Sequence, residues 1–120
     1  MNADDYLREA HDVQSREDVD PWMALMRVLT RRVVSRRMPS ALAWASTQAV
    51  EHWARRDGDL VTAKAEVWRY IDALQPHGAE MATEDGRTAR ALLCVLDASG
   101  GEESRHDVAA WFSSVVDGTN

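Results

Sequence analysis

The sequence predicts an all-α protein, a single-domain bundle of five to six helices. Apolar residues recur at spacings of three and four along most of the chain, and no segment alternates between apolar and polar residues as a strand does. Glycine and proline fall between the periodic segments, where helices end. The chain has 120 residues, 45% of them hydrophobic, which suffices to bury a core without disulfides. We therefore expect residues 1–120 to form one domain.

Residues 1–19 are an acidic N-terminal segment in which we expect a short docking helix over Ala3–Val13. Its narrow apolar stripe consists of Tyr6, Ala10 and Val13. A helix this short is marginal on its own and needs a surface to pack on. Residues 1–20 carry a net charge of −5 and residues 21–40 one of +5. The acidic segment is therefore expected beside the arginines that follow it and to neutralise them.

The second helix has a clear start. Asp20 is a good N-cap and Pro21 suits the first helical position. We expect this helix to run to about Met38, because Pro39 disfavours helical backbone in the residue before it.

The third and fourth helices are expected to form an antiparallel hairpin. The third should run from Ser40 to Asp57, with Gly58 as its left-handed C-terminal cap, and Asp59 should cap the next helix. The link between them is so short that the two helices must be neighbours. Residues 76–78, Pro-His-Gly, should end the fourth helix.

The last two helices complete the bundle. The fifth, about Thr83 to Ala98, is apolar on both faces and should be central, and the Ser-Gly-Gly at 99–101 is expected to break the chain. Ser104 can cap the final helix with Asp107 three residues later, a variant of the capping box, and Gly118 should close it.

The apolar faces of these helices predict the core. The expected members are Trp22, Leu25, Leu29, Val33, Leu42, Ala49, Trp53, Val67, Ile71, Leu92, Leu96, Val108, Trp111, Phe112 and Val115. Trp68 also falls beside the apolar face of its helix and is expected to be core.

Trp44 does not fit this pattern, because it points away from the apolar face of its own helix. A helix turns about 100° per residue, which places Trp44 among polar side chains. Either the N-terminal segment covers its ring or the ring anchors a partner. We favour the anchor, since polar neighbours are a normal rim for an interface. The predicted partner-binding residues are Trp44, Gln48, Glu51 and Arg55.

The arginine-rich second helix supports an alternative function, a small nucleic-acid-binding regulator. Its candidate phosphate-binding residues are Arg27, Arg31, Arg32, Arg36 and Arg37. Two observations count against it. The formal net charge of the chain is −6, whereas nucleic-acid binding depends mainly on neutralising phosphates. No aromatic residue interleaves with the arginines to stack on bases.

No set of residues predicts catalysis, a cofactor or a bound metal. His11, His52, His77 and His106 are far apart in the sequence, and a zinc site needs three or four convergent ligands. Cys94, the single cysteine, lies in an apolar run and is expected to be a buried, inert thiol. No phosphate-binding or nucleophile motif is present. We expect a protein that is not an enzyme.

The cysteine content, the charges of the first residues and the length of the apolar runs indicate the cellular location. A lone cysteine fits a reducing compartment. The first residues contain two aspartates where a signal peptide carries basic residues, and no apolar run approaches the length of a membrane span. The expected location is the cytoplasm.

One stretch of the chain resembles a known group of proteins. It contains Arg-Arg-Met-Pro-Ser-Ala-Leu-Ala-Trp-Ala at 36–45, a tryptophan at 53, and Ala-Lys-Ala-Glu-Val-Trp at 63–68. This resembles small all-helical bacterial proteins encoded beside secretion systems and polymorphic toxins, among them an immunity family. The resemblance implies a cytoplasmic protein that binds another protein, and it assigns no role to any residue.

The expected function is therefore that of a non-catalytic protein-binding protein of a bacterial antagonism or secretion locus. It would be an immunity protein, adaptor or chaperone that acts by occupancy. Its partner would be another protein, such as a basic toxin or secretion component, attracted by an acidic face. The candidate acidic faces contain Asp4, Asp5 and Glu9, or Glu80, Glu84 and Asp85. The sequence leaves open whether the chain also pairs with a second copy of itself.

Overall fold

A computed structural model describes residues 1–74, 80–97 and 104–117, and these residues form six α-helices and two 3-10 turns with no strand. The helices are α1 (Ala3–Glu17), α2 (Pro21–Val34), α3 (Ala43–Arg55), α4 (Leu60–Ala73), α5 (Glu84–Asp97) and α6 (Arg105–Val116). The turns are η1 (Ser40–Leu42) and η2 (Glu80–Ala82). The all-α bundle predicted from the sequence is confirmed.

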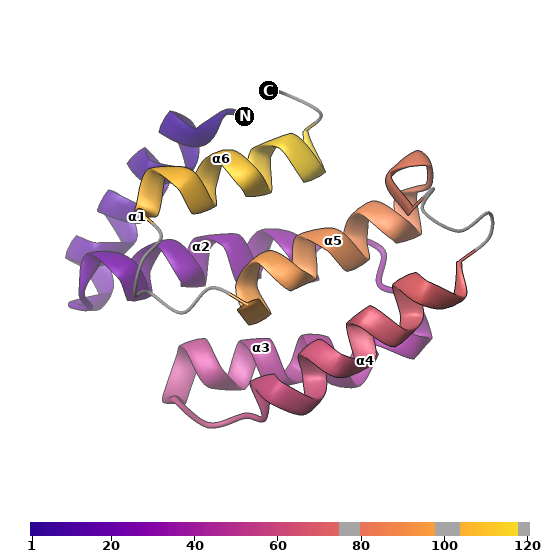
Figure 1. Cartoon of the computed structure of the whole chain (residues 1–120). Helices are drawn as coiled ribbons and strands as arrows, with labels where there is room; N and C mark the ends of the chain where they lie inside the picture. The colour runs from indigo at the N-terminus through magenta and orange to yellow at the C-terminus, as the bar shows by residue number, and fades with distance from the viewer. Residues whose placement is uncertain (75–79, 98–103, 118–120) are drawn as a thin grey trace.

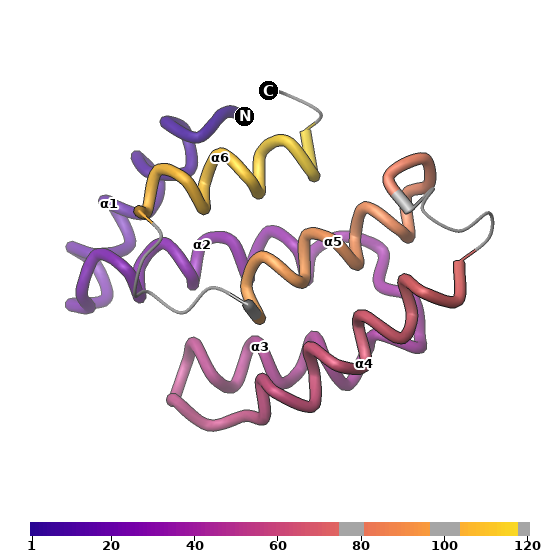
Figure 2. Tube along the Cα trace, in the orientation of Figure 1, coloured from indigo at the N-terminus to yellow at the C-terminus, as the bar shows by residue number. Residues whose placement is uncertain are grey.

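The helices stack as three layers of two. α2 and α5 form the middle layer, α1 and α6 cover one side of it, and α3 and α4 cover the other (Figure 1). The tube in Figure 2 follows the same path, with α1 and α6 on one side of the middle layer and α3 and α4 on the other. The radius of gyration is 13.6 Å, the value of roughly 13–14 Å expected for one compact domain of this length.

The predicted N-caps are confirmed. The carboxylate of Asp20 accepts a hydrogen bond from the backbone N–H of Met23, and that of Asp59 accepts one from the N–H of Thr62. Ser104 caps α6 through the N–H of Asp107. Each of these bonds satisfies an N–H group that the first turn of a helix leaves without an intrahelical acceptor.

Three predicted helix ends were wrong. α1 continues to Glu17 rather than Val13, because its last turn lies against the arginines of α2. α2 ends at Val34 rather than Met38, where the Arg36 N–H donates to the Val33 carbonyl in a tighter turn. The left-handed cap of α3 is Arg56, with φ of 61°, and not Gly58.

The remaining boundary predictions fall partly outside the described residues. The stop at 76–78, the residue Ala98, the break at 99–101 and the end at Gly118 all lie there. α5 itself agrees with its prediction, because both of its faces are buried in the middle layer.

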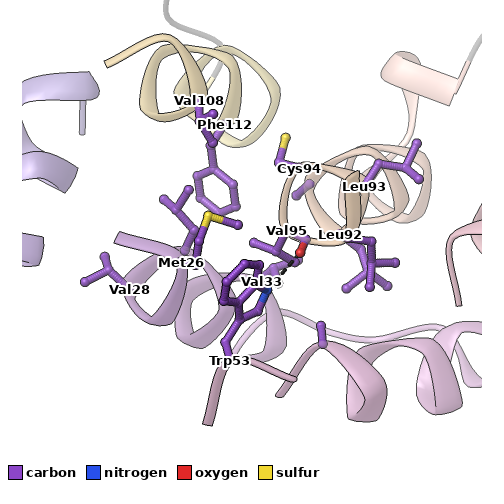
Figure 3. Packing of buried hydrophobic residues seen from close by; sticks show 14 of the residues in the cluster. Met26, Val28, Val33, Trp53, Leu92, Leu93, Cys94, Val95, Val108 and Phe112 are labelled. Atoms are coloured by element: carbon purple, nitrogen blue, oxygen red, sulfur yellow. Dashed lines mark hydrogen bonds between the residues drawn. The ribbon is translucent and has the colours of Figure 1, made fainter. Parts of the chain in front are cut away.

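Most of the predicted core is buried, including Tyr6, Ala10 and Val13 of α1. Figure 3 shows Phe112 of α6 reaching toward Met26 of α2, and Trp53 of α3 lying between α2 and α5. Three tryptophans depart from the prediction. Trp22 is half-buried, while Trp68 is 38% exposed and Trp111 is 36% exposed. Both exposed rings lie at the edge of their apolar stripes, and the Trp68 ring is covered in part by the guanidinium of Arg90 of α5, 5.1 Å from its centroid.

Candidate functional site

Trp44 lies on the outer face of α3 and is 44% exposed. Ala45, Ala49 and Trp53 of the same helix face the core and are buried. α1 packs against α2 and α6 on the opposite side of the middle layer (Figure 1). The N-terminal segment therefore does not cover Trp44, and the structure leaves the ring on the open face of the α3–α4 layer.

The other predicted partner-binding residues have roles within the fold. The side-chain oxygen of Gln48 accepts a hydrogen bond of 2.9 Å from the backbone N–H of Asp59, which fixes the turn between α3 and α4. Glu51 and Arg55 form an ion pair along the helix. The structure thus places the charged pair on the same face of α3 as Trp44, beginning about two turns further along, and makes Gln48 part of the hairpin.

The arginines of the alternative nucleic-acid site are largely neutralised. Glu17 receives hydrogen bonds of 2.8 Å from both Arg27 and Arg31, and Arg32 lies 2.6 Å from Glu9. The expectation that the acidic N-terminal segment neutralises α2 is confirmed.

The last two arginines of this set lie near the end of α2. Arg36 pairs with Glu84 of α5 and donates to the hydroxyl of Thr88. This link was not anticipated, because spacing along one chain gives no information about which distant acid a side chain will reach. Arg37 is exposed, with no ion pair to the described part of the chain.

The candidate acidic faces are also partly used within the fold. Asp5 accepts hydrogen bonds from the backbone N–H of Asn2 and from Arg8. Glu9 and Glu84 are engaged by arginines as described. Asp4 is exposed and Asp85 half-buried.

Arg27 joins three helices at one point. It donates 2.9 Å from Nε to the carbonyl of Trp53 and 3.4 Å from Nη2 to that of Ala54, besides its bond to Glu17. Both carbonyls lie in the last turn of α3, where no intrahelical N–H is available to them. The arginine therefore caps α3 while holding the end of α1 on α2.

The arginines lower the pKa of Glu17 to about 2 from an ordinary 4.5, mainly through the hydrogen bonds of Arg31 and also those of Arg27. A lowered folded-state pKa stabilises the fold above the unfolded value, and this stability is lost as pH falls toward the folded value. The relevant window is therefore between 4.5 and about 2.

Glu17→Gln should lower the free energy of unfolding by about 1 kcal/mol near neutral pH, since water screens a carboxylate that is still partly exposed. That difference from the wild type should narrow by roughly half between about pH 6 and pH 3. Urea unfolding at a series of pH values measures it. Asp12→Asn is the control, because Asp12 lies 4.0 Å from Arg16 on the open surface. A difference that stays constant across the window would contradict the assignment.

A hollow of about 370 Å³ lies between α2 and α3. It is lined by Glu17, Arg27, Thr30, Arg31, Val34, Val50, Trp53 and Ala54. Sequence reasoning did not find it. The sequence feature that could have indicated this hollow is a pair of valines, Val34 and Val50, at the borders of their apolar stripes. Both remain exposed instead of packing into the core.

The residues considered for chemistry are dispersed. Within the described ranges no group of three His, Cys, Asp or Glu side chains is placed to hold a metal ion. His11 and His106 are exposed, and His77 lies outside the described residues. The ring of His52 packs edge-on against Trp53, where burial and the charge of Arg56 lower its pKa.

Cys94 is buried, as expected, and its thiol contacts the Arg90 carbonyl at 3.5 Å.

Among the described helices none is long and apolar enough to cross a membrane. A scan against protein-family models gave no match, and neither the curated proteins nor the solved structures contain a significantly similar chain.

Proposed function

We propose that this chain is a protein-binding protein that acts by occupying its partner's surface, and that the outer face of α3 makes the contact. The observation that supports this most directly is the half-exposed ring of Trp44. Tryptophan is among the residues most enriched at interface hot spots. The ion pair of Glu51 with Arg55, on the same face of α3, supplies polar groups of the kind found at the rim of such interfaces.

The overall charge favours a basic partner. The formal net charge is −6, and α2's arginines are largely neutralised by acids of the same chain. An acidic protein attracts a basic partner at long range and accelerates association. The resemblance of residues 36–68 implies the class of this partner, a toxin or secretion component of a bacterial locus. This chain would then act in the cytoplasm as its immunity protein, adaptor or chaperone.

Trp44→Ala tests this proposal. It should weaken binding to the partner by about 2 kcal/mol, or roughly thirtyfold in dissociation constant. Folding should change little, by about 0.5 kcal/mol, because an exposed side chain contributes little to stability. Calorimetric titration against the protein products of neighbouring genes measures the first, and a thermal melt measures the second.

Val61→Ala is the matched control, because Val61 is 82% exposed on α4. This substitution should leave binding to the partner unchanged. Equal affinity for the Trp44→Ala and wild-type chains would contradict the proposed interface. A fall of more than about 10 °C in the melting midpoint would show that Trp44 acts in the core instead.

A further inference from the structure

The hollow between α2 and α3 combines an apolar wall with a charged rim. Val34 of α2 faces Val50, Trp53 and Ala54 of α3 across it. Its volume of about 370 Å³ falls within the range of roughly 300–1,000 Å³ typical of small-molecule sites. An apolar wall of this kind favours an aliphatic or aromatic body.

The polar groups at the rim offer hydrogen-bond donors rather than acceptors. Both oxygens of Glu17 already accept from arginine, Oε1 from Arg27 and Arg31 and Oε2 from Arg31. A guanidinium has five N–H donors, and more than half of the Arg31 side chain is exposed. Two arginines and one glutamate leave one positive charge at this rim. A ligand that matches it carries acceptors and a negative charge.

Thr30 is a second, independent indication. It lines the hollow from α2 and is only 4% exposed, and its hydroxyl has no hydrogen-bond partner within the described part of the chain. A buried hydroxyl without a partner destabilises a fold. Rotation about χ1 moves the threonine hydroxyl from one staggered position to another, and from there it can donate to a ligand acceptor.

We propose that this hollow binds a small organic carboxylate, whose apolar body lies against the two valines and Trp53 and whose carboxylate pairs with Arg31. The site is separate from the proposed protein contact. Val50 stands about 120° around α3 from Trp44, so each site can be tested while the other is left intact.

Hydrocinnamate and its neutral amide are a matched pair of probes. In spectra of the isotope-labelled protein, hydrocinnamate should shift the indole N–H of Trp53 and the backbone amides of Val50 and Ala54 in a saturable manner. The amide should bind about tenfold more weakly, because it lacks the charge that pairs with Arg31. Absence of a saturable shift up to about 10 mM, or equal affinity for acid and amide, would overturn the proposal.

Three variants locate the site. Thr30→Val should weaken hydrocinnamate binding severalfold while leaving the melting midpoint unchanged or higher, since it removes a hydroxyl without a partner. Val50→Asp should weaken it about tenfold by repulsion. Val61→Asp adds the same charge to an exposed position on α4 and should have no effect. Unchanged binding in Val50→Asp would show that the anion binds elsewhere and that this assignment is wrong.

Discussion

Replacing Trp53 with alanine should lower the free energy of unfolding by about 4 kcal/mol, the cost of deleting a large aromatic side chain from a core. Trp53 is 3% exposed. Its indole N–H donates 2.9 Å to the carbonyl of Val95 near the end of α5 (Figure 3). That carbonyl lies in the last turn of α5, where the described residues of the helix supply no N–H for it, so the same substitution also removes its donor. The melting midpoint should fall by roughly 15 °C.

A second substitution at this position separates packing from hydrogen bonding. Trp53→Phe keeps an aromatic ring in the core but removes the indole N–H, and should cost about 1–2 kcal/mol. Trp44→Ala serves as the matched control of the same chemistry at an exposed position. If Trp53→Ala and Trp44→Ala destabilise the protein equally, α3 does not pack as described.

Replacing Gly58 with alanine should cost about 3 kcal/mol, although Gly58 is exposed and buries nothing. Its φ is +109°, which side chains rarely tolerate. An added Cβ would lie 2.5 Å from the carbonyl oxygen of Gln48 and 3.2 Å from the backbone nitrogen of His52. Both atoms belong to the backbone of α3, so relief requires the turn to move away from the helix. Chemical denaturation of the variant measures the loss.

Arg56→Gly is the counterpart of that experiment. Arg56 adopts a left-handed conformation, with φ of 61°, that glycine adopts without strain. The stability gained by removing this strain is offset in part by the loss of the Arg56 guanidinium, which lies 5.5 Å from the Trp53 ring centroid. The net change should stay within about 1 kcal/mol. A Gly58→Ala variant as stable as Arg56→Gly would contradict the geometry of this turn.

The candidate sites were only partly predictable. Trp44 was identified by its position on the helical wheel, because the face a residue occupies depends on local spacing alone. The arginines were recognised as a cluster, and their neutralisation followed from the adjacent acidic segment. The pairing of Arg36 with Glu84 and the cap that Arg27 forms on α3 could not be predicted. These contacts depend on how helices distant in sequence are oriented.

Local sequence patterns were enough to predict the helical class, the caps at Asp20, Asp59 and Ser104, and most of the buried faces. These features depend on interactions within one or two helical turns, which the order of residues specifies directly.

How far each apolar face is covered could not be predicted from local patterns. In the folded chain Trp68 and Trp111 are exposed at the edges of their stripes, Arg56 forms the left-handed cap of α3, and a hollow remains between α2 and α3. Periodicity gives the direction of a side chain, whereas its burial depends on the neighbouring helix. The distance and crossing angle of that neighbour are set by the packing of the whole core.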